Sequence, residues 1–464
     1  MPRDTPPTSR TARTARFGGL VAGQSVRWAG TRAANLVRSE DRADAATGER
    51  AGALARELVA QLGQMRGAAM KLGQVLSTID FTAIPEGDRE EFKQTLAALR
   101  DDVKPVPFKK LRKLVEEELG GKLDALFAEF EEEAFAAASI GQVHKATTLD
   151  GRRIAVKIQY PGVAEAVETD LRNMQVLLPL IKRLAPGLDV KALAGELRER
   201  IAEELDYELE AQNQRAVARA WRGHPFVVVP EVDTSLSSRR VLVTELLDGR
   251  RFEEVKALPE AQRDRYAEIV FRFFFTTLLK LRRCSGDPHP GNYLLLADGK
   301  VGFLDFGFMR VIEPAYLQAE RDLAVAVTEG DAAEVHRLLA ELGYLPKPDE
   351  FEPEALLGQL ASAGEWYFVP GFRRLSPQYV ADTVELSSSP RSPYFDLMRR
   401  ETLPPQALLI RRMEGLVFTV LGELRAGADW HALASEFFAG SEPSTPLGEL
   451  DAEFWASRQV PSPA

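Results

Sequence analysis

The chain has 464 residues, of which 45% are hydrophobic and 28% charged, a composition typical of globular proteins rather than of disordered or membrane-embedded ones. A net charge of −10 argues against broad nucleic-acid binding by the whole surface, so we expect no nucleic-acid partner. A single cysteine, Cys284, excludes an intramolecular disulfide and a multi-cysteine zinc site, and it fits a reducing cytoplasm.

The N-terminal 40 residues are basic, since residues 1–38 contain seven arginines and one acid, Asp4. Residues 15–38 mix Trp28 and aliphatic side chains with small residues, which is typical of an amphipathic helix on an anionic membrane surface. A transit peptide and a solvated flexible tail share this composition, and all three interpretations stay open. Because no uncharged apolar run reaches about 18 residues, we expect a cytoplasmic protein that reaches a membrane only peripherally, on its inner face.

Helical periodicity dominates the chain up to about residue 122. The last helix predicted in this region begins at Pro107-Phe108 and ends at Gly120-Gly121. Strand-like runs over 143–147 and 154–158 follow. They are separated by Asp150-Gly151, which predicts a β-hairpin.

From about residue 165 onward, the sequence pattern is mainly helical. A long helix is predicted over 165–219, followed by two strands over 226–232 and 240–246. A short hairpin over 294–304 interrupts the later helices. These elements predict an α+β chain in five parts: a basic segment (1–40), a helical extension (41–130), a β-rich lobe (131–248), a helical lobe (249–440) and a tail (441–464).

Four residues carry the strongest chemical signal. Asn292 follows Asp287 by five residues, which is the spacing of the protein-kinase catalytic loop, and a hairpin then leads to Asp305-Phe306-Gly307. Magnesium needs hard oxygen ligands, which Asn292 and Asp305 supply. Lys157, on a predicted strand, is suited to neutralise nucleotide phosphates, and it needs a carboxylate partner. The acidic helix after it offers Glu203, Glu204, Asp206, Glu208 and Glu210.

The glycine-rich phosphate loop of ordinary kinases is replaced by A-A-A-S-I-G-Q-V at residues 136–143. Glycines let a loop approach phosphate oxygens closely, whereas the β-carbons of alanines restrict that approach. We therefore expect ATP to be covered differently here.

These motifs resemble the UbiB/ADCK atypical kinases, a branch of the protein-kinase-like superfamily tied to coenzyme Q biosynthesis. The resemblance covers about residues 60–310. It rests on six segments: K-L-G-Q at 71–74, A-A-A-S-I-G-Q-V-H at 136–144, A-V-K-I-Q-Y-P-G-V at 155–163, E-L-D-Y at 204–207, D-P-H-P-G-N at 287–292 and L-D-F-G at 304–307. It implies a bilobal protein-kinase-like fold with a helical N-terminal K-x-G-Q extension, and Mg-ATP bound between the lobes.

The resemblance also implies a role for each candidate residue. Catalytic roles fall to Asp287, Lys157 and Glu210, the last as the ion-pair partner of Lys157. Magnesium ligation falls to Asn292 and Asp305. Regulatory contacts join Glu204 and Asp206 to Lys71 and Gln74. ATP contacts fall to Ala136, Ala137, Ala138, Ser139, Ile140, Val143, Lys157 and the hinge residue Glu245.

In this family the K-x-G-Q segment blocks the site where a peptide substrate would bind. The resemblance therefore implies ATP hydrolysis, or phosphorylation of a non-protein acceptor, in support of quinone or isoprenoid lipid metabolism. One alternative is a pseudokinase-like, ATP-gated regulator that binds a lipid, a quinone precursor or a partner with negligible turnover. Another is a protein kinase with an unusual activation segment.

Gly286 stands where an ordinary kinase has the Arg of His-Arg-Asp, so the base strength of Asp287 does not follow from the motif. The acceptor, the pathway partner and the oligomeric state stay open.

Three features also have ordinary structural interpretations. The aromatic stripe over 271–275 is expected in the core of the helical lobe. His289 is expected to make a structural hydrogen bond, and His144 is expected to fill the β-rich lobe.

Overall fold

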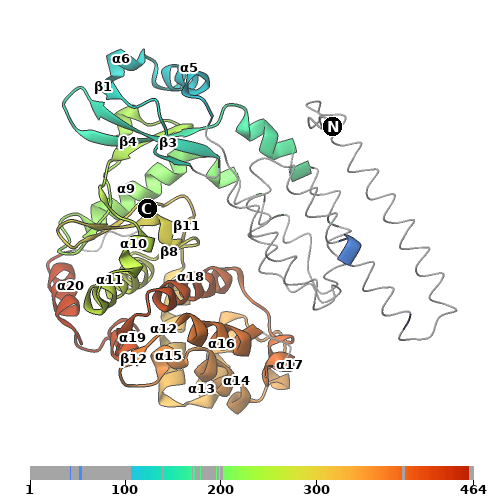
Figure 1. The fold of residues 1–464 in the computed structure, drawn as a ribbon. Helices are drawn as coiled ribbons and strands as arrows, with labels where there is room; N and C mark the ends of the chain where they lie inside the picture. The colour runs from blue at the N-terminus through green and yellow to red at the C-terminus, as the bar shows by residue number, and fades with distance from the viewer. Residues whose placement is uncertain are drawn as a thin grey trace. The chain divides into compact units, whose positions relative to one another are not determined.

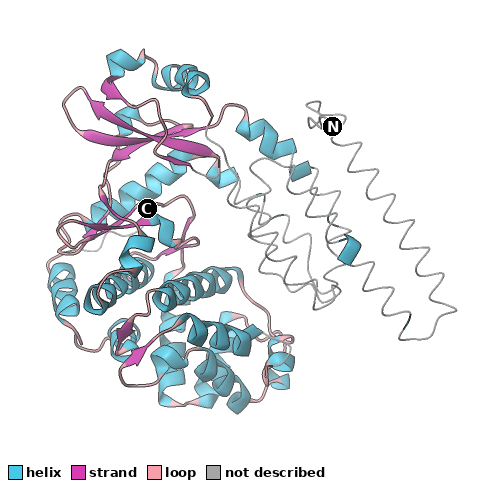
Figure 2. Ribbon diagram, viewed as in Figure 1, coloured by secondary structure: helices cyan, strands magenta, loops and turns pink. Residues whose placement is uncertain are grey.

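The computed structural model describes residues 42, 52–54, 106–137, 140–169, 171–172, 178, 195, 198, 202–388 and 392–458. The chain divides into two compact units. The first unit comprises residues 1–209 and 233–244, and the second comprises residues 210–232 and 245–464. Helices and strands both contribute to the described parts, which confirms the predicted α+β class (Figure 2).

The described part of the first unit contains a five-stranded sheet (Figure 1). Its strands are β1 (Phe127–Phe130), β2 (Ala136–Ala137), β3 (Gly141–Thr148), β4 (Arg153–Gln159) and β6 (Val241–Glu245). They are ordered β1-β3-β4-β6, and β2 pairs with β3. The predicted hairpin is confirmed as the antiparallel β3–β4 pair, in which Val143 lies opposite Lys157. Gly151 at its turn has a φ of 84°, which glycine adopts without steric cost.

Helix α5 (Phe108–Leu119) packs against this sheet, and α6 (Leu123–Leu126) leads into β1. The predicted bounds of α5 are confirmed: it follows Pro107, and Gly120 ends it with a φ of 70°. The buried face of α5 shares one hydrophobic cluster with strand residues such as Val156 and Val243. Each large apolar side chain buried in this way contributes about 1.5–3 kcal/mol. The cluster therefore holds the helix on the sheet.

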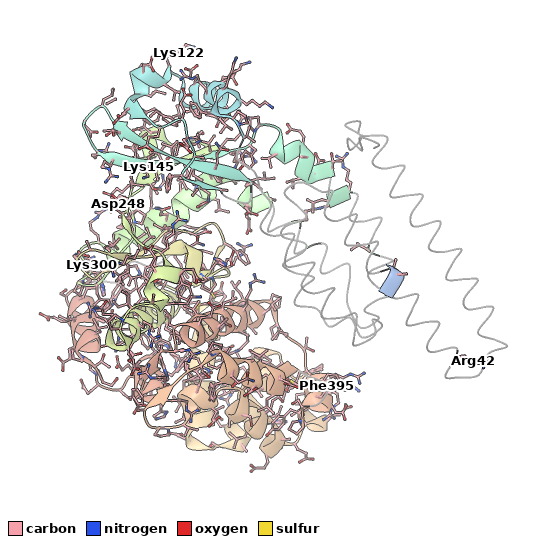
Figure 3. All side chains as sticks on the ribbon, in the orientation of Figure 1. Arg42, Lys122, Lys145, Asp248, Lys300 and Phe395 are labelled. Carbon is pink, nitrogen blue, oxygen red and sulfur yellow. The ribbon has the colours of Figure 1, made fainter. Side chains whose placement is uncertain are left out.

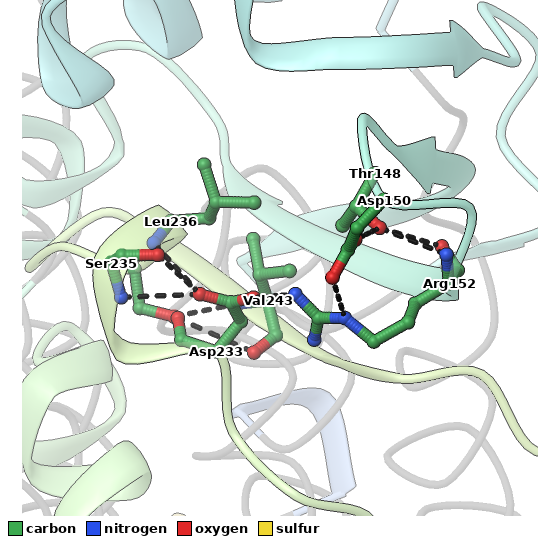
Figure 4. A network of polar contacts seen from close by, with 8 residues as sticks. Thr148, Asp150, Arg152, Asp233, Ser235, Leu236 and Val243 are labelled. Atoms are coloured by element: carbon green, nitrogen blue, oxygen red, sulfur yellow. Dashed lines mark hydrogen bonds and ion pairs between the residues drawn. The ribbon is translucent and has the colours of Figure 1, made fainter.

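A polar network ties the turn of the β3–β4 hairpin to the segment before β6 (Figure 4). Arg152 donates from Nε to Asp150 (2.8 Å) and from Nη2 to Asp233 (2.9 Å). The other carboxylate oxygen of Asp233 accepts bonds from the backbone N–H groups of Ser235 and Leu236, and so caps the short helix η1 (Thr234–Leu236).

The second unit is mainly helical. Its helices are α9 (Tyr207–Trp221, which begins in the first unit), α10 (Phe252–Lys256), α11 (Glu260–Leu279), α12 (Pro314–Glu329), α13 (Ala332–Leu342), α14 (Pro353–Ala363), α15 (Glu365–Phe368), α16 (Pro377–Ser388), α17 (Phe395–Met398), α18 (Pro405–Glu423), α19 (Trp430–Phe438) and α20 (Pro446–Ala456). Short 3-10 helices lie at η2 (Pro290–Asn292) and η3 (Pro348–Glu350).

Three small sheets accompany these helices. Their strands are β5 (Val227–Val228), β7 (Gly249–Arg250), β8 (Arg283–Ser285), β9 (Tyr293–Leu296), β10 (Val301–Phe303), β11 (Met309–Val311), β12 (Arg373–Arg374) and β13 (Gly427–Ala428). The orders are β5-β10-β9-β7, β11-β8 and β12-β13. The predicted hairpin over 294–304 is confirmed as β9–β10, and Lys300, labelled in Figure 3, follows its turn. The pairing of β8 with β11 was not expected from the sequence.

Helix α11 lies in the core of the second unit. The four phenylalanines of the aromatic stripe, Phe271, Phe273, Phe274 and Phe275, are all buried, as predicted. Phe273 stacks on Phe303 of β10 with ring centroids 3.6 Å apart. Because this packing fixes β10, it also supports the hairpin that carries the candidate site.

Two sequence-based expectations are wrong. The predicted helix over 165–219 is interrupted before Tyr207, because Asp206 Oδ1 accepts the N–H groups of Glu208 (3.0 Å) and Leu209 (3.2 Å) and so starts α9 as its N-cap.

The expected tail over 441–464 instead contains α20. Thr445 caps this helix and Pro446 opens it, so the polar and proline residues at the beginning of this segment belong to a helix start. Leu447 and Trp455 of α20 are buried in the main core. Asp451 Oδ1 accepts a hydrogen bond from Trp455 (3.1 Å) and lies 3.0 Å from Nε2 of the buried His224.

Candidate functional site

The β9–β10 hairpin brings Asn292 and Asp305 together. The backbone N–H of Leu304 donates to the carbonyl of Asn292 (3.0 Å), which closes the hairpin at this end. Asn292 Nδ2 then donates to Asp305 Oδ2 (3.1 Å), and the N–H of Gly307 donates to Asp305 Oδ1 (2.9 Å). The Asp305 carboxylate is therefore held in a fixed orientation while its side chain stays exposed.

The donor set of this pair fits magnesium. A carboxylate and an amide supply hard oxygen ligands, and magnesium usually keeps several waters beside one or two protein ligands and substrate phosphates. Among the described residues, no group of three or more His, Cys, Asp or Glu side chains is arranged to hold a metal ion. A cation at Asn292 and Asp305 would therefore complete its coordination with water and phosphate oxygens.

The loop before Asn292 is shaped by His289. The ring Nδ1 of His289 accepts the backbone N–H of Gly291 (3.1 Å), and the backbone N–H of His289 donates to the carbonyl of Asp287 (2.7 Å). His289 thus makes the structural hydrogen bond that we expected and caps η2.

A small cavity of about 10 Å³ lies against Asp287, Asn292 and Asp305. Its inner wall is aromatic and includes Tyr293, whose hydroxyl is buried without a hydrogen-bond partner. Burial raises the pKa of Tyr293. A cavity of this size holds about one water molecule and no nucleotide.

Gly286, directly before Asp287, is fixed by its neighbours. Its N–H donates to the carbonyl of Phe308 (2.8 Å), and its carbonyl accepts a bond from Nε of Arg412 on α18 (2.8 Å). Sequence reasoning missed Arg412, which lies 126 residues further along the chain and belongs to no recognised motif.

Helix α9 lies close to the Asp305-Phe306-Gly307 segment. A Cβ added at Gly307 would lie 3.4 Å from both Asp305 Oδ1 and Glu210 Oε2, so the two carboxylates flank this glycine. Glu210 is buried, with 5% of its surface exposed. Lys157 and Glu210 belong to different units, so the ion pair between them stays a prediction.

Lys157 lies on β4 in the first unit, and its Nζ is 4.8 Å from the centre of the Tyr207 ring. A cation over an aromatic face is attracted by the ring quadrupole. Tyr207 is buried and belongs to the E-L-D-Y segment. Sequence reasoning considered only the acids of this segment, although an aromatic residue beside them was a usable signal.

The described part of the alanine-rich loop joins the sheet. Ala136 and Ala137 form β2 and pair with Val143 and Gln142, whereas Ala138 and Ser139 lie outside the described residues. Ile140, also expected to contact ATP, is buried.

Gly141 begins β3 at a point where it closely approaches its neighbours. An added Cβ would lie 2.3 Å from the backbone oxygen of Ile158 and 2.9 Å from the Tyr207 hydroxyl. This glycine is therefore required by packing within the first unit rather than by phosphate contact alone.

Gln142 is a buried residue that sequence reasoning missed. Its side chain accepts the N–H of Val106 (2.8 Å) and donates to the carbonyl of the same residue (3.1 Å). Its amide nitrogen lies 2.9 Å from Nε2 of His144, whose Nδ1 is 2.9 Å from the carbonyl oxygen of Glu131. Burial lowers the pKa of His144, which fills the interior of the first unit as expected.

The remaining predicted residues are divided. Lys71 and Gln74 lie outside the described residues, so their contacts with Glu204 and Asp206 stay predictions. Glu245 is the first residue of the second unit after Thr244, and its role at a hinge stays a prediction. Its Oε2 accepts the N–H of Glu231 (3.0 Å), and its own N–H donates to the carbonyl of Glu231 (3.0 Å).

Comparisons with known proteins agree with these features. The sequence profile described as the ABC1 atypical kinase-like domain matches residues 98–339. The chain is 32% identical over 343 residues to the atypical kinase COQ8B, mitochondrial, of Danio rerio, covering 73% of this chain and 54% of that protein. It is 32% identical over 296 residues to the atypical kinase coq-8, mitochondrial, of Caenorhabditis elegans, covering 63% of this chain and 39% of that protein. The matches thus span about half or less of these relatives.

A solved structure gives the same result for the fold. The complex of Rv3197 with erythromycin from Mycobacterium tuberculosis aligns with a TM-score of 0.63 and 32% identity, and covers 86% of this chain and 98% of that one. The kinase-like α+β fold and the resemblance to UbiB/ADCK atypical kinases are therefore confirmed. The family profile covers more than half of the sequence, and the chain belongs to the ABC1 atypical kinase-like family.

Proposed function

We propose that this protein binds Mg-ATP and either hydrolyses it or transfers its γ-phosphate to a non-protein acceptor. The observation that carries this proposal is the pair of Asn292 and Asp305, 3.1 Å apart on one hairpin, in a segment that also supplies Asp287. Phosphoryl transfer depends mainly on positioning and on stabilising phosphate charge, and little covalent chemistry is required of the protein.

Each residue has a distinct task in this proposal. Asn292 and Asp305 hold magnesium, which when bound neutralises phosphate charge. Lys157 binds the α- and β-phosphates, and the Tyr207 ring restricts the position of its ammonium group. Glu210 pairs with Lys157, and Asp287 orients the attacking hydroxyl or water. The N–H of Gly307 keeps the Asp305 carboxylate in one orientation, which limits reorganisation on nucleotide binding.

The acceptor belongs to quinone or isoprenoid lipid metabolism, or is water. Support comes from the family and from relatives whose names include coq-8 and COQ8B, of which this chain matches 39% and 54%. Among the described residues, no helix is both long and apolar enough to cross a bilayer. The protein reaches lipid peripherally through residues 15–38, which lie outside the described residues.

The K-x-G-Q segment regulates access to the site. Lys71 and Gln74 contact Glu204 and Asp206 and exclude a peptide, so the acceptor is not a protein. Asp206 also caps α9 and so fixes the start of the helix that carries Glu210.

Phosphate release tests the proposal. The wild type and Lys71→Ala are measured with Mg-ATP, with and without anionic liposomes. We expect the wild type to release phosphate. We expect Lys71→Ala to release phosphate at a different rate, in the presence or in the absence of liposomes. Nucleotide binding without phosphate release would favour the pseudokinase-like regulator, and radiolabel transfer to proteins in a lysate would favour a protein kinase. Absence of nucleotide binding would refute the proposal.

A further inference from the structure

We propose that Arg412 is a positioning residue for Asp287 and that it replaces, from the C-terminal side of the chain, the His-Arg pair that precedes this aspartate in ordinary kinases. This inference rests on the proposed function, because it assigns a role within the same site. The contacts that carry it lie entirely within the second unit.

Both backbone groups of Gly286 are bonded. The N–H donates to Phe308, just beyond the Asp-Phe-Gly segment, and the carbonyl accepts Nε of Arg412, each at 2.8 Å. That carbonyl belongs to the peptide unit that leads into Asp287. The Arg412 bond therefore fixes the plane from which the Asp287 side chain projects.

Side chains also pack closely around Gly286. A Cβ added at Gly286 would lie 2.0 Å from Cε1 of Phe308 and 2.8 Å from Cδ1 of Leu409 on α18. Leu409 and Arg412 are three residues apart and thus share one face of α18. This face holds Gly286 by both a hydrogen bond and a close packing contact.

Helix α18 is itself anchored at this point. Arg411 donates from Nη1 to Glu414 (2.6 Å), and it forms an ion pair with the buried Glu320 of α12. On the other side, the sulfur of Met413 is 3.9 Å from that of Cys284 on β8. Because the residues on both sides of Arg412 are fixed, its guanidinium is presented to Gly286 from a rigid base.

The chemistry of the contact favours arginine over lysine. The Nε–H of arginine is part of a planar guanidinium and points in a defined direction, whereas a lysine ammonium rotates freely on a flexible stem. Lysine at 412 would therefore retain charge without restoring the orientation of the Gly286 peptide.

The experiment compares Arg412→Ala and Arg412→Lys with a matched control, Arg337→Ala, which removes an exposed arginine paired with Glu334 and Glu341 on α13. We measure the affinity for Mg-ATP, kcat and KM for phosphate release, and hydrogen exchange of a peptide covering residues 284–292. Guanidinium is then added to Arg412→Ala as a rescue.

In Arg412→Ala we expect kcat to fall by about 100-fold, the cost of a small misplacement, with KM and nucleotide affinity unchanged. Guanidinium restores part of kcat, exchange over 284–292 accelerates, and Arg412→Lys stays impaired. The control matches the wild type. If Arg412→Ala fails to fold, Arg412→Lys provides the same comparison.

Two results overturn the inference: unchanged exchange over 284–292, or accelerated exchange with an unchanged kcat. A wild type that binds no nucleotide or releases no phosphate contradicts the proposed activity instead. The exchange measurement still decides whether Arg412 holds the loop, so the two failures are distinguishable.

Discussion

The side-chain amide of Asn213 donates a hydrogen bond of 3.1 Å to the backbone carbonyl of Phe306. Both residues are buried. The oxygen of the same amide accepts a longer bond from Arg283 on β8 (3.4 Å). Asn213 follows Glu210 by about one turn of α9, so one face of this helix carries both side chains. The Asp-Phe-Gly segment is thus attached to the helix that bears the candidate partner of Lys157.

Replacing Asn213 by Leu should destabilise the protein by about 1–3 kcal/mol, because the carbonyl of Phe306 loses its side-chain donor in a buried position. Urea unfolding at neutral pH measures the difference. Asn213→Asp serves as the comparison, since it keeps an acceptor for Arg283 but loses the donor to Phe306. Wild-type stability in Asn213→Leu would show that the bond contributes nothing.

Asp305→Asn should abolish magnesium-dependent nucleotide binding, because it removes the only carboxylate of the Asn292–Asp305 pair. Thermal stabilisation by Mg-ATP is the measurement. Asp298→Asn is the matched control: Asp298 lies on the same hairpin, accepts the N–H of Lys300 (3.1 Å) and faces solvent. Retention of normal ATP-dependent stabilisation by Asp305→Asn would remove the magnesium assignment.

The ring of Tyr207 should matter more than its hydroxyl for the position of Lys157. A cation–π contact contributes about 0.5–2 kcal/mol, so Tyr207→Leu should reduce turnover by roughly twofold to thirtyfold, while Tyr207→Phe keeps most of it. Steady-state phosphate release compares the two variants with the wild type. Equal losses in both would assign the effect to the hydroxyl.

Asp233 should make stability pH-dependent. Burial opposes its ionisation, yet hydrogen bonds from Ser235 and Arg152 leave the pKa of Asp233 below its ordinary value. A carboxylate with a lowered folded-state pKa stabilises the fold above its unfolded pKa of about 3.9, and this stabilisation is lost as pH falls through the folded value.

Asp233→Asn should therefore unfold at a lower urea concentration than the wild type at pH 7. Its free energy of unfolding should be lower by up to about 1 kcal/mol, the scale of a partly exposed ion pair, because asparagine still caps η1 but loses the charge that pairs with Arg152. The difference should be constant down to about pH 5, should begin to shrink near pH 4, and should disappear only below the lowered folded-state pKa. Asp150→Asn, at the exposed end of the same network, is the comparison. A difference that persists at low pH would mean that the charge of Asp233 is not responsible.

Local features of the fold were predictable from the sequence. The β3–β4 and β9–β10 hairpins follow from Asp-Gly turns between short strand-like runs, and α5 follows from Pro107 and Gly120 at its ends. The approach of Asn292 to Asp305 follows in turn from the second hairpin. The N-cap role of Asp206 was also readable, because an Asp before a helical run is a start signal.

Features that depend on distant contacts were not predictable. Strands β8 and β11 have three residues each and pair across more than twenty residues, so neither carries a periodic signal. The contacts of Gln142 with Val106 and of Arg412 with Gly286 join polar side chains to backbone groups far away in sequence. A single polar residue gives no spacing pattern, and only the folded backbone shows which carbonyl it reaches.

Helix α20 has a consequence for how the chain is synthesised. Trp455 packs edge-on against Trp221 with ring centroids 5.1 Å apart, and Arg458 donates to the carbonyl of Ala220 (3.1 Å) at the end of α9. The core of the second unit is therefore incomplete on the ribosome until residue 458 has emerged. Until then, the aromatic surface around Trp221 lacks its cover, which makes the nascent chain a candidate client for chaperones.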